Sequence, residues 1–137
     1  MNARKILVDT DVLIDFLRRK EKAAKILDEA SDNGDLYCSV ITLAELYAGM
    51  RPAEKEDTEK LVAGMTILPV TESIARRGGR LRNDARPRNI LLPDCLIAAT
   101  ALEEECRLLT FNEKDYPFSD VVLYGPTKVT FDAVVKE

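Results

Sequence analysis

The chain has 137 residues, with 20 basic and 24 acidic side chains, a formal net charge of −4 and no histidine. Mechanisms that move protons through imidazole, or hold zinc with it, are therefore excluded, and carboxylate chemistry remains. The hydrophobic share of 46% and the mixed charge signs are typical of a folded globular protein, and this length predicts one domain over residues 1–137.

Two features predict a cytoplasmic protein. The apolar run 6–8 is far too short for the core of a signal peptide or for a membrane span, so we expect no membrane partner. Cys38, Cys95 and Cys106 are odd in number, widely spaced and without a C-x-x-C pair, which predicts reduced, partly buried thiols.

The first half of the chain alternates short apolar runs with helical patterns. In chain order it predicts a strand at 6–8, helices at 12–17 and 23–30, a strand at 36–40, and helices at 42–49 and 53–63. The spacing Thr42-x-x-Glu45 matches a capping box at the start of the third of these helices.

The second half continues the alternation. It predicts a strand at 66–68, an arginine-rich helix at 72–85, a helix at 94–105 that is apolar nearly all round, and strands at 108–111 and 121–124. Gly78 and Gly79 are expected to loosen the arginine-rich helix, and Pro93 suits the first position of the apolar one. Strands alternating with helices predict an α/β fold with one parallel sheet of about five strands, covered on both faces.

Polar side chains gather where the predicted strands end. Asp9 ends the first strand, Glu45 lies in the helix after the second, Asp94 opens the helix before the fourth, and Asn112 and Asp115 follow the fourth. Ligands of such sheets bind beyond the carboxyl ends of the strands, where the strand order reverses. We therefore expect these five side chains to converge at one edge of the sheet.

The apolar surroundings of Asp9, Glu45 and Asp94 favour a function over a structural role. Taken singly, Asp94 could favour a helix N-terminus and Glu45 could be the capping-box partner of Thr42. Carboxylates among core residues are costly to desolvate, however, and several in one pocket repel one another. A hard divalent cation such as Mg²⁺ or Mn²⁺ resolves that conflict, and the site then suits metal-assisted phosphodiester hydrolysis without histidine.

Four segments, 8–15, 42–49, 94–102 and 108–116, resemble in order the successive motifs of PIN-domain nucleases, particularly VapC-type toxins of toxin-antitoxin pairs. The resemblance covers nearly the whole chain. It implies a three-layer α/β/α PIN-like fold, an Mg²⁺- or Mn²⁺-dependent endoribonuclease and inhibition by a small VapB-like antitoxin. It also implies a homodimer and a toxin-antitoxin hetero-oligomer, for which exposed apolar residues such as Phe16 are candidates.

The resemblance assigns roles residue by residue. Asp9, Glu45 and Asp94 match the three acids of the family's metal site. Asp115 matches a further catalytic acid that acts as an outer ligand or positions water. The candidate contacts are Thr10, Asp11 and Asn112. Asn112 stands where many PIN domains have aspartate, and Asp11 where the toxins often have asparagine; Thr10 and Asp11 each have the alternative reading of a helix cap.

A basic segment is concealed by the negative total. Residues 76–88 hold six arginines and one acid, a local charge of +5. Guanidinium groups grip phosphate oxygens, so we predict RNA contacts from this segment. The predicted RNA-binding residues are Arg76, Arg80, Arg82 and Arg86. The alternative is a solvated helix face joined by salt bridges to glutamates.

Two further functions fit parts of the sequence. Asp9-Thr10-Asp11-Val12 also fits the motif of haloacid-dehalogenase-type phosphatases, with Asp9 as nucleophile and Asp11 as general acid/base, although the lysine and late metal motif of that family are not evident. A non-catalytic metal- or RNA-binding α/β module is the second alternative. No role is predicted for the tail 125–137.

Overall fold

The computed structural model describes residues 4–125, so the tail from residue 126 onward lies outside the described residues. The strands are β1 (Lys5–Val8), β2 (Asp35–Ser39), β3 (Thr66–Leu68) and β4 (Arg107–Leu109). The α-helices are α1 (Thr10–Leu17), α2 (Glu21–Asn33), α3 (Val40–Gly49), α4 (Lys55–Ala63), α5 (Glu72–Asp84) and α6 (Leu92–Glu103). Short 3₁₀ helices are η1 (Pro52–Glu54), η2 (Arg86–Arg88) and η3 (Glu113–Asp115).

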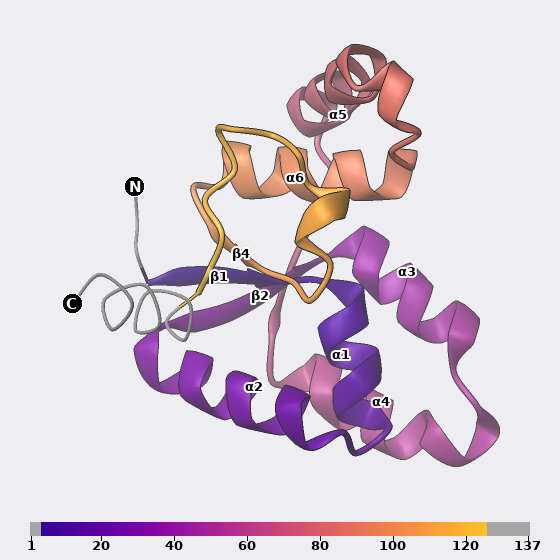
Figure 1. Ribbon diagram of the computed structural model, residues 1–137. Coiled ribbons are helices and arrows are strands. Elements are labelled where there is room, and N and C mark those ends of the chain that lie inside the picture. The colour runs from indigo at the N-terminus through magenta and orange to yellow at the C-terminus, as the bar shows by residue number, and fades with distance from the viewer. Residues whose placement is uncertain (1–3, 126–137) are drawn as a thin grey trace.

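Helices cover both faces of the sheet, as predicted. α5 and α6 lie on one side of it, α1, α2 and α4 lie on the other, and α3 leads away from the edge where β2 ends (Figure 1). None of the helices within residues 4–125 is long and apolar enough to cross a membrane. The arrangement is the three-layer α/β/α architecture expected from the alternating pattern.

All pairings in the sheet are parallel, and the strand order is β3-β2-β1-β4. The chain moves outward from β1 to β3 and then returns to place β4 on the other side of β1. The strand order therefore reverses between β1 and β4, and the crevice beyond their carboxyl ends is where such sheets bind ligands.

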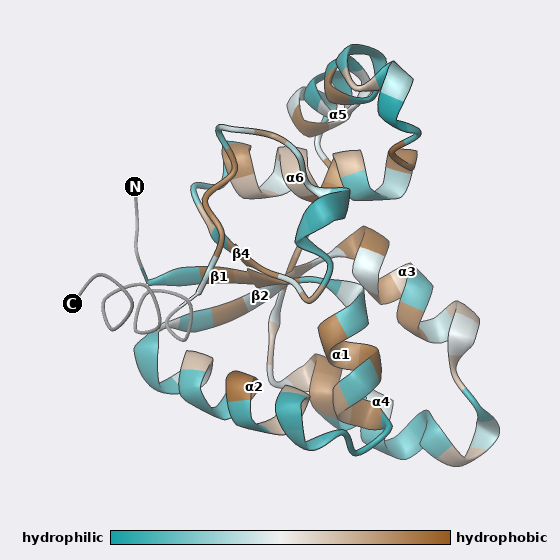
Figure 2. Ribbon diagram, viewed as in Figure 1, coloured by the Kyte–Doolittle hydropathy of each residue, from teal (hydrophilic) through white to brown (hydrophobic). Residues whose placement is uncertain are grey.

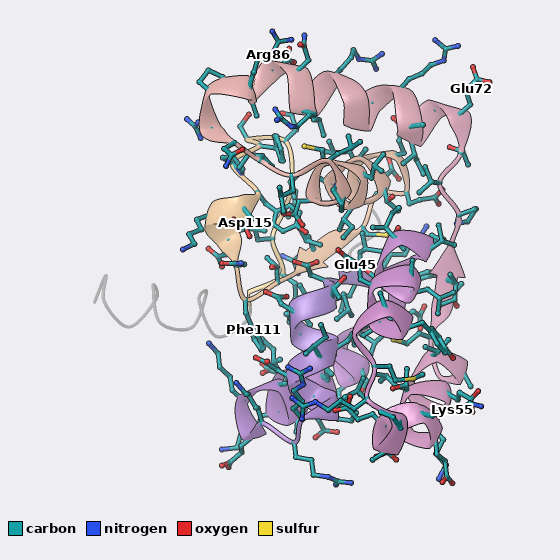
Figure 3. All side chains as sticks on the ribbon, turned by 90° about the vertical axis from the view of Figure 1, so that its right-hand side faces the viewer. Glu45, Lys55, Glu72, Arg86, Phe111 and Asp115 are labelled. Carbon is teal, nitrogen blue, oxygen red and sulfur yellow. The ribbon has the colours of Figure 1, made fainter. Side chains whose placement is uncertain are left out.

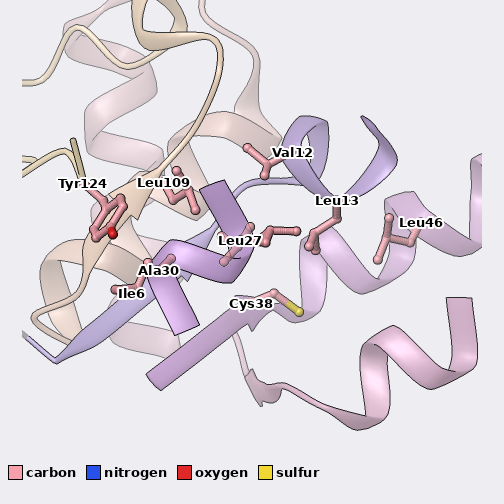
Figure 4. Close-up of a cluster of buried hydrophobic side chains, with 10 residues drawn as sticks. Ile6, Val12, Leu13, Leu27, Ala30, Cys38, Leu46, Leu109 and Tyr124 are labelled. Atoms are coloured by element: carbon pink, nitrogen blue, oxygen red, sulfur yellow. The ribbon is translucent and has the colours of Figure 1, made fainter. Parts of the chain in front are cut away.

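The side chains of β1 explain the two-sided core. Ile6 and Val8 point into one apolar cluster with α1 and α2, whereas Leu7 points into the other with α6, because successive side chains of a strand face opposite sides. Figure 4 shows the first cluster closing around Ile6, Leu27 and Leu109. The three cysteines are buried and free, as predicted.

The packing of α5 on α6 differs from the expectation for Gly78. A Cβ at this position would come within 2.7 Å of Leu96 Cδ2 and 3.3 Å of Leu96 Cα. The glycine therefore allows the two helices to approach closely, and α5 continues unbroken to Asp84. Hydrophilic residues dominate α5, whereas α6 is largely hydrophobic (Figure 2). The inner helix α6, which carries Asp94, is thus held firmly between α5 and the sheet.

Two predicted elements differ from the structure. The segment 121–124 forms a single bridge between Leu108 and Leu123 and no strand, so the sheet has four strands within residues 4–125. The reason is that β4 is only three residues long, and Leu108 alone exchanges backbone hydrogen bonds with Val122 and Tyr124.

The start of α3 also differs. The helix begins at Val40, and its N-cap is Ser39, whose hydroxyl accepts from the N–H of Ile41. Thr42 lies inside the helix and is fully buried, so the capping-box reading of Thr42 and Glu45 is wrong. Glu45 is consequently free of that structural role.

Candidate active site

A cavity of about 240 Å³ opens at the edge of the sheet where β1 and β4 end. The residues around it are Asp9, Thr10, Asp11, Ile14, Glu45, Asp94, Asn112 and Asp115. The structure therefore brings together all four acids and all three candidate contacts that the sequence singled out. Glu45 reaches this region from α3 and Asp115 from η3 (Figure 3).

Asp9 is the most firmly fixed of the acids. It caps α1 directly after β1, only 6% of its surface is exposed, and its backbone N–H donates to Leu109 O at 2.8 Å. Its Oδ1 accepts from the N–H of Thr10 at 2.8 Å, and its Oδ2 accepts from the hydroxyl of Thr110 at 2.8 Å. Each carboxylate oxygen has a second lone pair, so both remain able to accept a further ligand.

Glu45 is held by a threonine of the neighbouring helix. The hydroxyl of Thr10 donates to Glu45 Oε1 at 2.6 Å and lies 3.0 Å from the hydroxyl of Thr42. Thr10 is buried in the first turn of α1, so this contact ties α1 to α3 beside Asp9. Thr10 thus orients Glu45. It is not the cap of α1, because Asp9 occupies that position.

Asp94 lies in the first turn of α6 and is partly buried. The hydroxyl of Tyr116 donates to its Oδ1 at 3.4 Å, which is a long hydrogen bond. Tyr116 follows η3 and is itself buried, with 5% of its surface exposed. The third acid is therefore oriented from the segment after β4.

The remaining polar residues complete the wall of the cavity. Asn112 donates from Nδ2 to Asp115 Oδ2 at 2.7 Å, so these two side chains act as a pair. Asp11 lies inside α1 and is not its cap, and its Oδ1 is buried without a hydrogen-bond partner in the described part of the chain. Such an orphaned acceptor is costly to bury.

Burial, together with the repulsion between their negative charges, raises the pKa values of several of the acids. Burial, followed by the charge of Asp9, raises the pKa of Asp94 to about 6 and that of Asp11 to about 7. Burial also raises the pKa of Asp9, against the lowering effect of the hydrogen bonds from Thr110 and Thr10. The cavity therefore disfavours the accumulated negative charge that it would carry at neutral pH.

The donor set fits a hard divalent cation. Its oxygens belong to five carboxylates, one hydroxyl and one amide, without histidine or a cysteine pair, which suits Mg²⁺ or Mn²⁺. Within residues 4–125 no three acidic side chains already close on one point as a complete ligand set. That is compatible with Mg²⁺, which keeps several waters and needs only one or two protein carboxylates.

The arginines separate into two groups. Arg76 pairs with Glu72, with Nη2 and Oε2 at 2.7 Å, and Arg77 pairs in the same way with Glu103. The solvated-face alternative therefore describes part of α5. Arg82, by contrast, lies close enough to α6 for its charge to lower the pKa of the Cys95 thiol, against burial, the larger effect, which raises it.

Arg86 follows α5, at the start of η2, and hydrogen-bonds Asn83. Cys95 follows Asp94 in α6, so Arg82 lies close to the helix that carries this acid. Arg80 is exposed on α5, where its charge lowers the pKa of Glu103, an effect smaller than those of Ser73 and Arg77.

The contacts also identify residues that sequence reasoning missed. Thr110 holds Asp9, Thr42 supports Thr10, and Tyr116 contacts Asp94. Thr110 and Tyr116 do stand inside the fourth motif, next to Asn112 and Asp115. A search of the motifs for hydroxyl side chains, in addition to acids, would have found them.

Comparison with known proteins identifies the family of this chain. The PIN-domain family model matches residues 6–122. Ribonuclease VapC10 of Mycobacterium tuberculosis is 45% identical over 114 residues, covering 82% of this chain and 86% of that protein. Ribonuclease VapC19 of the same organism is 40% identical over 114 residues, covering 81% of this chain and 91% of that protein.

The fold is found again in solved structures. A toxin-antitoxin complex from Klebsiella pneumoniae contains a chain that is similar with a TM-score of 0.73 and 28% identity, covering 85% of this chain and 95% of that chain. The family match runs from the second residue of β1 to beyond β4 and includes every residue of the cavity, which decides against the haloacid-dehalogenase-type alternative. The chain belongs to the PIN-domain family.

Proposed function

We propose that this chain is a divalent-metal-dependent endoribonuclease that acts as the toxin of a toxin-antitoxin pair in the cytoplasm. The observation that carries the proposal is the convergence of Asp9, Glu45, Asp94 and Asp115 on one cavity beyond β1 and β4. The names of its relatives, ribonucleases VapC10 and VapC19, support RNA as the substrate.

Asp9, Glu45 and Asp94 hold the cation, which is Mg²⁺ or Mn²⁺. When bound, such an ion polarises the scissile phosphate and supplies an activated water. The residues themselves prepare the site: Thr110 and Thr10 fix Asp9 and Glu45 before the ion arrives. Preorganised ligands bind a metal more tightly, because less freedom is lost on binding.

Asp115 and the arginines handle the substrate. One oxygen of Asp115 accepts from Asn112, which leaves the other free to orient a water near the phosphate. Arg82 and Arg86, with Arg76 and Arg80 farther along α5, bind RNA phosphates on either side of the cut. Asp11 adds one more carboxylate oxygen toward the cavity, supported by its orphaned Oδ1.

A second region supports the antitoxin as partner. Two adjoining cavities of about 620 and 590 Å³ share Phe16, Ala24, Leu36, Leu61 and Met65, and together form an apolar groove between α1, α2 and α4. Phe16 is 37% exposed there. We assign this groove to an apolar segment of the antitoxin, since a toxin-antitoxin complex is among the structures of this fold. A homodimer stays a prediction, which light scattering of the purified chain would test.

The test of the proposed function is Asp9→Asn, with Asp15→Asn as control. Asp15 lies on the same helix, is partly exposed and contacts Lys20 outside the cavity. We expect Asp9→Asn to fold normally and lose Mg²⁺-dependent RNA cleavage by about 10³-fold or more, in line with the loss of a metal ligand. Asp15→Asn should cleave like the wild type. Wild-type turnover in highly purified Asp9→Asn protein would refute the proposal.

A further inference from the structure

The three acids proposed to hold the cation share a feature: each is contacted by the hydroxyl of another element. Thr110, after β4, donates to Asp9, and Thr10, on α1, donates to Glu45. Tyr116, after η3, donates to Asp94. The acids lie on different elements, so these hydroxyls fix their relative orientation.

Asp94 depends on its hydroxyl more than Asp9 does, because Asp9 has further partners. Asp9 is also held by the N–H of Thr10 and by its position as the cap of α1. For the Asp94 carboxylate, Tyr116 is the one hydrogen-bond partner that the described residues provide. Without it, no hydrogen bond from the described residues would fix the orientation of this carboxylate.

The surroundings of Tyr116 suit a donor. Its ring packs in the apolar cluster of Leu7, Ile97 and Leu108, which fixes the position of the hydroxyl. Burial, the charges of Asp9 and Asp94, and a hydrogen bond to Asp9 raise the pKa of that hydroxyl, so the hydroxyl acts on Asp9 as well as on Asp94. A hydroxyl proton aimed at carboxylates, which only accept, has a defined direction. Phenylalanine would fill the same apolar space, so the hydroxyl itself carries the effect.

We propose that Tyr116 is a positioning residue that holds the Asp94 carboxylate in place for the divalent cation. The inference rests on the proposed function, because it assumes that Asp94 is a ligand. Partners that orient metal ligands typically change metal affinity 10- to 100-fold when removed. Since the contact of 3.4 Å is long, we expect the lower end of that range, about tenfold.

The experiment compares Tyr116→Phe with Tyr124→Phe. Tyr124 is equally buried, at 5% exposed, but its hydroxyl is bonded to Asn33 Nδ2 at 3.0 Å, away from the cavity. Binding of Mn²⁺ is measured on RNA-free protein by the electron paramagnetic resonance signal of the free ion. Tyr116→Phe should bind Mn²⁺ about tenfold more weakly than the wild type, and Tyr124→Phe should bind it equally well.

A titration of RNA cleavage against Mn²⁺ separates positioning from general damage. For Tyr116→Phe the curve should shift about tenfold to higher Mn²⁺, and the rate at saturation should return close to that of the wild type. A lowered saturating rate without a shift would indicate a merely structural role and overturn the inference. Unchanged Mn²⁺ affinity in Tyr116→Phe, beside a loss in Asp9→Asn, would overturn it and leave the proposed function standing. If Asp9→Asn also bound Mn²⁺ like the wild type, the proposed function itself would fail.

Discussion

The acidic cavity and the apolar groove lie at the two ends of the same helix, α1, and they differ in the polarity of the residues that line them. The N-terminal end contributes Thr10 and Asp11 to a cavity lined almost wholly by polar residues. The C-terminal end contributes Phe16 and Leu17 to a groove lined mostly by apolar ones. One short helix therefore joins the proposed catalytic site to the proposed docking site.

The difference teaches how each region gains its specificity. In the cavity, hydrogen bonds fix single oxygens, so replacing one atom alters the chemistry. In the groove, apolar area is left uncovered, and its affinity for a partner is spread over several side chains with a few dominant anchors. Substitutions at the two ends should consequently separate cleavage from inhibition.

The largest effect that tests this separation is expected for Phe16→Glu. Charging an exposed anchor in the groove should weaken antitoxin binding by about 30-fold or more, since such anchors commonly contribute about 2 kcal/mol. RNA cleavage by the free toxin should persist. Calorimetric titration with the product of a neighbouring small reading frame, beside a cleavage assay, measures both quantities.

The control is Tyr47→Glu. Tyr47 is an exposed aromatic residue of α3, with 41% of its surface accessible, and it does not line the groove. Antitoxin affinity should therefore stay at the wild-type value. Loss of cleavage in Phe16→Glu would show that α1 couples the two regions, and the separation would be wrong.

The convergence of acids was predictable because it depends on few facts. Asp9 and Asp115 follow strands that are parallel neighbours, Asp94 lies in the first turn of α6, and Glu45 lies near the middle of α3, which begins where β2 ends. Parallel strands end on the same side, so chain order alone brings these residues together.

Other features were not predictable from local pattern. The groove collects Phe16, Ala24, Leu36 and Leu61 from four elements, and no motif marks such a surface. Thr42 matched a capping box, but Ser39 caps the helix three residues earlier, and Thr42 is buried in contact with Thr10 of α1. Capping patterns state what a residue can do locally, and tertiary packing decided otherwise.

A smaller effect is expected from pH, and it is specific to the cavity. The raised pKa values of Asp94 and Asp11 mean that the native state binds more protons than the unfolded state between about pH 4 and pH 7. The free energy of unfolding should therefore fall as pH rises through that window when metal is chelated. Both carboxyls are partly exposed, and solvent screening limits the loss to about 1–2 kcal/mol in total.

Urea unfolding at several pH values, in EDTA and in Mg²⁺, measures this effect. Divalent cation should restore the lost stability near neutral pH, because it binds the ionised carboxylates of the native state. Asp94→Asn should flatten the pH dependence in EDTA, since one of the two carboxyls no longer titrates. A wild-type stability that rises with pH across this window would contradict the electrostatic strain assigned to the cavity.

The smallest effect concerns the arginines, and it extends the contrast to RNA binding. Arg82 lies close to α6, the helix that carries Asp94, whereas Arg76 is already paired with Glu72 on the outer face of α5. Replacing Arg82 and Arg86 with alanine should lower the slope of log affinity against log salt by about 1.4, at roughly 0.7 for each phosphate contact of a single strand. Arg76→Ala should change this slope less, because Arg76 must leave its ion pair with Glu72 before it can contact a phosphate.

Fluorescence anisotropy of a labelled RNA oligonucleotide, in Ca²⁺ or with Asp9→Asn to prevent cleavage, gives this slope. An equal change for Arg76→Ala would place the RNA along the whole outer face of α5. An unchanged slope in the Arg82 and Arg86 variant would instead make these arginines part of the solvated surface. The slope reports how many RNA phosphates contact basic side chains. It therefore measures the local basic surface directly, although the protein carries a net charge of −4.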